Sequence, residues 1–449
     1  MKIEEKEFNK NIINIKQMLA ASLNVPYYRS LYRKCNIDIA NIKNYEDFKK
    51  IPITTKQDYR KNISDFINED ILAAGFNLEE SLKKKFPRAY FKKHNIDLVM
   101  SSGSTGEPLT IAKHHRDSNN AFLLLNMHRK KKNDDILNMP YIWIWPVNPI
   151  TRIESIGCKN DFEQINQYGN IYYLYKYNDM VFEKLFKFML KEKVKWIIAA
   201  PSILSYFSDY IIKNAKKNIL DIRYIECQSE YMFDWQSQII KEAFNIIPTN
   251  IYATNEVQFI ASTCSKGKMH VFTKNVFVEL LETDKNVKEV VISTMCYKQM
   301  PLLRYKIGDC ADWEENSCDC DNTTPVINLK QYRLNDLVVG KNNYYEHWIT
   351  TDAMLALQLK NIFEFSQYQI IQEKVDEFQF KFRSSEIPNY VIMEEVKVFL
   401  KNYLERVLEY EIGIKINISK EQIPNDPISG KFKFFYCKIK DKIKEENVY

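Results

Sequence analysis

The amino-acid sequence predicts an α/β protein with a large N-terminal domain and a small C-terminal α+β domain. Over most of the chain, short apolar runs typical of strands alternate with helical patterns, which indicates helices packed on a mainly parallel sheet. After about residue 336 the pattern changes to strands around a single long helix. A chain of 449 residues that is 45% hydrophobic is also long enough for two or three domains.

The elements are predicted in order along the chain. Residues 1–60 should form helices that are broken near Pro26 and Pro52, with Thr54 or Thr55 as an N-cap. Strands 96–100 and 109–113 should be joined by the sequence SSGSTGEP. The remaining predicted strands are 141–145, 196–200, 246–254, 276–282, 289–295, 363–371, 377–384, 412–418 and 432–440, and the predicted helices are 181–193, 201–215 and 390–410.

Composition limits the classes of partner. The net charge of +6 comes from 64 Lys and Arg against 58 Asp and Glu, a balance that suits a small anionic substrate better than a nucleic acid. No apolar run approaches the roughly 20 residues that a membrane span needs. We therefore expect no nucleic-acid partner, no membrane span and a cytoplasmic location. Nine cysteines without a secretory signal indicate free thiols or metal ligation.

The loop at residues 101–108 contains two of the ten glycines in the chain. Glycine lets a backbone approach a ligand closely, and serine and threonine hydroxyls donate to phosphate oxygens. The loop is not a Walker A motif, because Glu107 and Pro108 follow where that motif needs Lys and Ser or Thr. A phosphate-binding loop and an ordinary turn both fit these residues.

Three further segments contain residues suited to a nucleotide. In YATNE, the Tyr252 ring could stack on adenine and the Glu256 carboxylate could hold Mg²⁺. Asp309, which follows Gly308 at a predicted strand end, could accept both ribose hydroxyls. Tyr252 could instead be a core aromatic and Glu256 a surface acid, and Gly308 and Asp309 could simply form a turn. RLND begins at Arg333, and SGK places Lys431 near the C-terminus.

The order of these segments resembles the adenylate-forming (ANL) superfamily, in particular its phenylacetate-CoA ligase-like, capsule-biosynthesis CapK-like branch. The resemblance covers nearly the whole chain and includes VPYYRSLY, IPITTKQDYR, MPLLRYKIGD and SGKFK. It implies an adenylation domain over residues 1–332, a hinge at 333–336 and a small mobile domain over 337–449. It also implies that ATP activates a carboxylic acid as an acyl adenylate, with release of pyrophosphate, before the acyl group is transferred.

The resemblance also implies roles for single residues. Lys431 would neutralise charge at the α-phosphate, Glu256 would bind Mg²⁺, Tyr252 would stack on adenine, and Asp309 and Arg333 would hold the ribose. Ala253, Thr254 and Asn255 complete the nucleotide segment. The β- and γ-phosphates would be held by Ser101, Ser102, Gly103, Ser104, Thr105 and Gly106.

The sequence departs from the family pattern at several positions. Glu107 stands where a lysine is common, Ala253 replaces a glycine, Asn255 replaces a frequent threonine, and Tyr332 replaces the glycine before the arginine; Asn335 replaces a hinge acid. A degenerate scaffold that binds a nucleotide or acyl group without turnover is therefore an alternative, although a scaffold has no need of Lys431. A phosphate-loop kinase is disfavoured by the missing Lys-Ser/Thr.

The acid and its acceptor are left open. Trp143, Trp145, Trp196 and residues 226–233 are candidates for an acyl pocket and equally for the core. Coenzyme A is the acceptor that the branch uses; an acyl carrier protein, an amine and a sugar are alternatives. A homodimer is also left open.

A metal site is predicted independently of the nucleotide segments. Cys264, His270, Cys318 and Cys320 are the ligand types of tetrahedral zinc. Four protein ligands leave no open position, so we expect a structural Zn²⁺ rather than a catalytic one. Four free side chains are the alternative interpretation, which a similar Cys and His set in chains of the resembling branch disfavours.

Overall fold

The computed structural model describes part of the chain and divides it into two compact units. The described residues are 2–61, 63–77, 93–100, 110–146, 162–174, 179–283, 287–315, 318–333, 338–341, 344–345, 362–363, 365, 367–421, 423–424 and 435–439. One unit comprises Met1–Leu281, Val290–Ile307 and Ala311–Asn328; the other comprises Glu282–Glu289, Gly308–Cys310 and Leu329–Tyr449. Residues 334–337 lie outside the described part, so the hinge at 333–336 stays a prediction.

Short helices form the start of the first unit, as predicted. Pro26 opens α3 because its fixed φ suits a first helical turn, and Thr55 caps α5. The Thr55 hydroxyl accepts from the Asp58 N–H at 3.2 Å, while the Asp58 carboxylate accepts from the Thr55 N–H at 2.9 Å. The helices are α1 Ile3–Lys10, α2 Ile12–Ser22, α3 Pro26–Lys34, α4 Tyr45–Phe48, α5 Lys56–Lys61 and α6 Glu69–Ala73, with 3₁₀ turns at Ile39–Asn41 and Ile63–Phe66.

An eight-stranded sheet follows, in the spatial order β10-β9-β8-β7-β6-β3-β5-β4. Its five central strands, from β8 to β5, are mutually parallel, and antiparallel strands lie at both edges. Its strands are β3 Tyr141–Pro146, β4 Phe162–Gln164, β5 Gly169–Leu174, β6 Trp196–Ala199, β7 Tyr224–Gln228, β8 Thr249–Thr254, β9 Gln258–Thr263 and β10 Met269–Val271. β8 starts three residues later than predicted, because Pro248 has no N–H to donate to a sheet.

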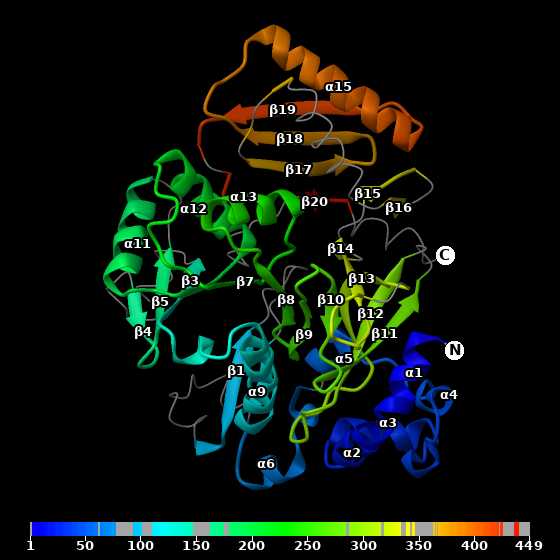
Figure 1. Cartoon of the computed structure of the whole chain (residues 1–449). Helices are drawn as coiled ribbons and strands as arrows, with labels where there is room; N and C mark the ends of the chain where they lie inside the picture. The colour runs from blue at the N-terminus through cyan, green and yellow to red at the C-terminus, as the bar shows by residue number, and fades with distance from the viewer. Residues whose placement is uncertain are drawn as a thin grey trace. The chain divides into compact units, whose positions relative to one another are not determined.

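Helices cover both faces of this sheet. On β6, Ile197 and Ala199 join the core made with α11 (Asp179–Lys191), α12 (Pro201–Lys213) and α13 (Asp234–Phe244), whereas Trp196 and Ile198 face the other way. On that second side, α9 (His115–Lys132) packs against β8 and β9 through Ala121 and Leu125 (Figure 1). The alternation of strand residues between two helical layers confirms the predicted α/β class.

Smaller sheets flank this core along the chain. β1 (Ile96–Met100) pairs antiparallel with β2 (Thr110–His114), with Met100 opposite Thr110, as expected for strands joined by one loop. A four-stranded sheet has the order β11-β12-β13-β14, with bounds Val276–Glu282, Lys288–Thr294, Tyr305–Trp313 and Ile327–Arg333. A short 3₁₀ turn spans Ile136–Asn138.

The second unit contains the predicted α+β arrangement. Its sheet has the order β19-β18-β17-β20, with bounds Gly413–Ser419, Glu377–Arg383, Gln367–Lys374 and Phe435–Cys437. Phe378, Phe380 and Phe382 are buried on one face of β18. They pack against the inner side of α15 (Tyr390–Leu408), where Val396, Leu400, Leu404 and Leu408 recur every four residues. β15 (Val338–Val339) and β16 (Tyr344–Tyr345) form a separate antiparallel pair.

Candidate functional site

Tyr252, Ala253 and Thr254 form the end of β8, and Asn255 and Glu256 lie in the turn between β8 and β9. Tyr252 is buried in β8, and Ala253 packs beside Ile251 and Phe259. The Thr254 hydroxyl accepts from the Val257 N–H at 3.3 Å, and Gln258 takes a positive φ of 60°, so the chain reverses within four residues. Asn255 is exposed at this turn, whereas Glu256 turns inward and is only 5% exposed.

Glu256 lines a small hollow in the first unit. Its carboxylate Oε1 is 3.6 Å from the Lys56 Nζ at the start of α5. The rest of the lining is mostly aromatic and aliphatic, with two further charged side chains, Lys113 and Asp117. The lining consists of Tyr59, Phe66, Ile111, Ala112, Lys113, His114, Asp117, Glu256, Tyr297, Met300 and Leu302.

Lys113 and Asp117 are both buried, and burial shifts both pKa values. Burial lowers the pKa of Lys113 to about 8, although Glu256 and Asp97 favour its charged form. Burial raises the pKa of Asp117 to about 6, although three backbone N–H groups donate to its carboxylate. These donors are Lys298, Gln299 and Met300, at 3.0, 3.0 and 2.9 Å. Asp117 therefore holds the segment that leads into β13.

Several predicted site residues are not among the described residues that line this hollow. Ser101, Ser102, Gly103, Ser104, Thr105, Gly106 and Lys431 lie outside the described part of the chain, as does the side chain of Arg333 at the end of β14. Asp309 belongs to the other compact unit. It also lies within β13 rather than at a strand end as predicted, because the strand continues past Gly308, whose φ is +93°.

The tryptophans proposed for an acyl pocket have other surroundings. Trp196 is 2% exposed, stacks on Tyr141 at 4.5 Å between ring centroids, and donates its indole N–H to the Met139 carbonyl. Trp143 and Trp145 contact each other edge to face. Neither of these nor Trp196 is among the side chains that line the hollow.

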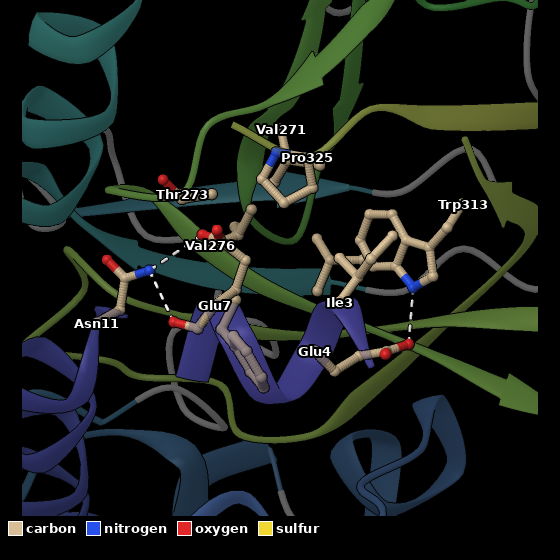
Figure 2. Close-up of a pocket in the computed structure, with 11 residues that line it drawn as sticks. Ile3, Glu4, Glu7, Asn11, Val271, Thr273, Val276, Trp313 and Pro325 are labelled. Atoms are coloured by element: carbon tan, nitrogen blue, oxygen red, sulfur yellow. Dashed lines mark hydrogen bonds between the residues drawn. The ribbon is translucent and has the colours of Figure 1, made fainter. Parts of the chain in front are cut away.

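A second hollow lies beside α1 and has a different character. Figure 2 shows Glu4 accepting a hydrogen bond from the Trp313 indole, while Asn11 donates to Glu7. Its acidic side chains are thus engaged in fastening α1, and the described lining includes no predicted site residue.

The four predicted metal ligands lie together in the first unit. Their ligand atoms, on Cys264, His270, Cys318 and Cys320, are all within 4.8 Å of one another. Cys264 Sγ is 3.7 Å from Cys318 Sγ, and Cys320 Sγ is 3.3 Å from His270 Nε2. Tetrahedral zinc with ordinary bond lengths places such atoms about 3.8 and about 3.5 Å apart. The residues therefore fit one tetrahedral ion.

Backbone groups orient these ligands. The Thr324 carbonyl is 2.9 Å from His270 Nδ1, so a proton on Nδ1 would leave Nε2 directed at the cysteines. Burial lowers the pKa of His270, which favours the neutral imidazole that binds metals. Burial opposes ionisation of Cys264, but backbone N–H groups of Lys266 and Lys268 and the neighbouring thiols lower its pKa overall.

The sequence analysis did not identify Lys56, Lys113, Asp117 or Tyr297 as neighbours of Glu256. Each belongs to a different helix, strand or loop, and no local motif marks it. Tertiary packing brings Lys113, Asp117 and Tyr297 to the hollow beside Glu256, and brings Lys56 to within 3.6 Å of the Glu256 carboxylate.

The chain resembles proteins of known identity in sequence and in fold. It is 22% identical over 451 residues to Protein CapK of Staphylococcus aureus, an alignment that covers 93% of this chain and 86% of CapK. No protein-family model matches the chain. Among the helices that the structure describes, none has the length and apolar character needed to cross a membrane.

Two solved structures share most of this architecture. A 2-hydroxyisobutyryl-CoA ligase in the postadenylation state, in complex with R3-HIB-AMP, superimposes with a TM-score of 0.65 at 12% identity, covering 97% of this chain and 91% of that ligase. The anthranilate CoA ligase AuaEII, in complex with anthranoyl-AMP, gives a TM-score of 0.51 at 12% identity, covering 78% of this chain and 67% of the ligase. At these identities the likeness concerns the fold.

Proposed function

We propose that this chain, which has the fold of adenylate-forming acid–CoA ligases, activates a carboxylic acid with ATP. A carboxylate oxygen would attack the α-phosphorus, the bond from that phosphorus to the bridging oxygen would break, and pyrophosphate would leave. The acyl adenylate would then lose AMP when a nucleophile attacks its carbonyl carbon. Each step conserves atoms without a redox partner.

The observation that carries this proposal is the position of Glu256. Glu256 is 5% exposed, lies two residues after the end of strand β8, and lines a hollow that Lys113 also lines. Ligands of open α/β sheets bind beyond the carboxyl ends of the parallel strands, which is where Glu256 lies. An inward carboxylate of this kind suits Mg²⁺, which would be brought in with the phosphates.

The remaining roles rest on the family resemblance. Tyr252 would contact adenine, Asp309 and Arg333 the ribose, and residues 101–106 the terminal phosphates. Lys431 would place its ammonium at the α-phosphate only while the carboxylate attacks. The small domain would rotate near residues 333–336 to admit the acceptor.

Coenzyme A is the acceptor that we propose. A 2-hydroxyisobutyryl-CoA ligase of similar fold has been solved with 2-HIB-AMP and CoA in its thioesterification state, with a TM-score of 0.51 to this chain. The cysteamine sulfur of CoA would attack the acyl carbon and AMP would leave. An acyl carrier protein carries the same thiol chemistry, and an amine or a sugar hydroxyl would yield an amide or an ester.

Isotope exchange between pyrophosphate and ATP tests the activation step. With a panel of aliphatic and aromatic acids, wild-type protein should return label to ATP only in the presence of its acid. Glu256→Gln should reduce this exchange, while Glu242→Gln, at an exposed ion pair with Lys217, should leave it unchanged. Tight ATP binding without exchange for any acid would instead support the scaffold alternative.

We further propose that Cys264, His270, Cys318 and Cys320 bind one structural Zn²⁺. The donor set of three sulfurs and one nitrogen, and its spacing, support this assignment. Four protein ligands leave no position for a substrate or water, so the ion would stabilise the fold around β9 and β10.

A further inference from the structure

Lys113 is an unusual buried cation on β2. It pairs in register with Asp97 of β1 and is 5% exposed. A lysine is seldom buried this deeply unless its ammonium has a partner. No hydrogen bond joins its ammonium to another described residue. Lys113 instead lines the hollow that Glu256 also lines.

The two carboxylates that favour a charged Lys113 each contact another side chain. Glu256 Oε1 is 3.6 Å from the Lys56 Nζ, and Asp97 Oδ1 is 3.0 Å from the His115 Nε2. Asp117, the third carboxylate of this region, is engaged by three backbone N–H groups. The charge of Lys113 is therefore incompletely balanced within the described residues, and its burial lowers its pKa.

We propose that Lys113 is an anion-binding residue whose ammonium pairs with an oxyanion of a ligand bound in this hollow. The oxyanion would come either from a phosphate of the nucleotide or from the carboxylate of the acid. The inference rests on the proposed function for the identity of the ligand, and on Lys113, Glu256 and Lys56 for the site itself.

Anion binding gives a physical reason for burying the Lys113 ammonium, which otherwise destabilises the protein. An incompletely paired buried ammonium lowers the stability of the free protein, because its lost hydration is not replaced. A bound oxyanion would restore that interaction with a charge-assisted bond. The hollow is lined by Lys113 and Glu256, and Lys56 pairs with Glu256; such a set favours an anion accompanied by a divalent cation.

Calorimetry on the full-length protein tests the proposal with two probes, magnesium pyrophosphate and benzoate. Lys113→Met should weaken binding of one probe at least about tenfold, and Lys113→Arg should retain it within a few fold because it keeps the charge. Weakened pyrophosphate binding assigns Lys113 to the phosphates, and weakened benzoate binding assigns it to the acid. Lys130→Met, on the exposed side of α9, is the control.

Thermal unfolding without ligand separates this role from a structural one. A ligand-binding lysine predicts that Lys113→Met melts at or above the wild-type temperature, whereas a structural ion pair predicts a lower one. Unchanged affinity for both probes in Lys113→Met, or no binding of either probe to wild type, overturns the proposal. Loss of acid-dependent exchange in wild type would refute only the adenylation, since probe binding is measured without turnover.

Discussion

Arg129 and Glu226 form a two-point ion pair in the interior of the first unit, although 97 residues separate them in the sequence. Arg129 Nε is 2.8 Å from Glu226 Oε2, and Nη2 is 2.7 Å from Oε1. The Glu226 side chain has no exposed surface, and the guanidinium carbon lies 5.1 Å from the centre of the Trp196 ring. The pair therefore ties the end of α9 to the central strand β7.

Breaking this pair should destabilise the protein strongly. Arg129→Met would leave Glu226 buried without its cation, which typically costs about 3–5 kcal/mol. Lys217→Met breaks an exposed pair with Glu242, at 39% and 57% exposure, and should cost less than about 1 kcal/mol. Urea denaturation of both variants measures the difference. Equal losses would show that the buried pair contributes no more than a surface pair.

Metal removal should destabilise the first unit. We expect about one zinc per chain by elemental analysis of protein purified without chelator. Cys318→Ser should lose the metal and lower the melting temperature, whereas Cys35→Ser, at an exposed cysteine outside the cluster, should change neither. An unchanged melting temperature in metal-free Cys318→Ser would exclude a structural role.

Stability should fall in mild acid because of His128. Burial, and then Lys132, lower the pKa of this imidazole to about 4, and its Nε2 lies 2.9 Å from the Ser262 hydroxyl. The unfolded chain binds a proton near pH 6.5, so this contribution is complete above that pH and is lost as the pH falls toward 4. Urea midpoints of His128→Gln should decline less than those of wild type over this range. Parallel declines would assign the acid sensitivity to other groups.

Lys431 should act in only one half-reaction. Lys431→Ala should reduce acid-dependent pyrophosphate exchange by about 10² to 10³, the usual cost of a lost transition-state donor, while ATP affinity stays within a few fold. Supplied with synthetic acyl adenylate, the variant should still transfer the acyl group, because the proposed rotation removes the lysine from that step. An equal loss in both half-reactions would contradict the rotation.

Local residue patterns predicted many of the elements, although not β5, β7, β9, α9 or α13, and residue type indicated the chemistry of the candidate residues. Strand positions such as 96–100 and 276–282 coincide with β1 and β11, because alternation and apolar runs are local properties that the neighbouring residues express directly. The residue types of Cys264, His270, Cys318 and Cys320 were enough to propose them as metal ligands, and the structure brings the four together. The small domain was visible as a change of pattern near residue 336.

Tertiary structure decided which side chains meet. Glu256, in the turn after β8, lies near Lys113 of β2 and Lys56 of α5. Arg129 pairs with Glu226, although 97 residues separate them in the sequence. It also decided that Asp309 lies within β13, because one glycine of positive φ was accommodated without ending the strand. These side-chain contacts depend on the order of strands in the sheet and on the packing of helices from distant segments. The local periodicity of apolar residues contains no information about either.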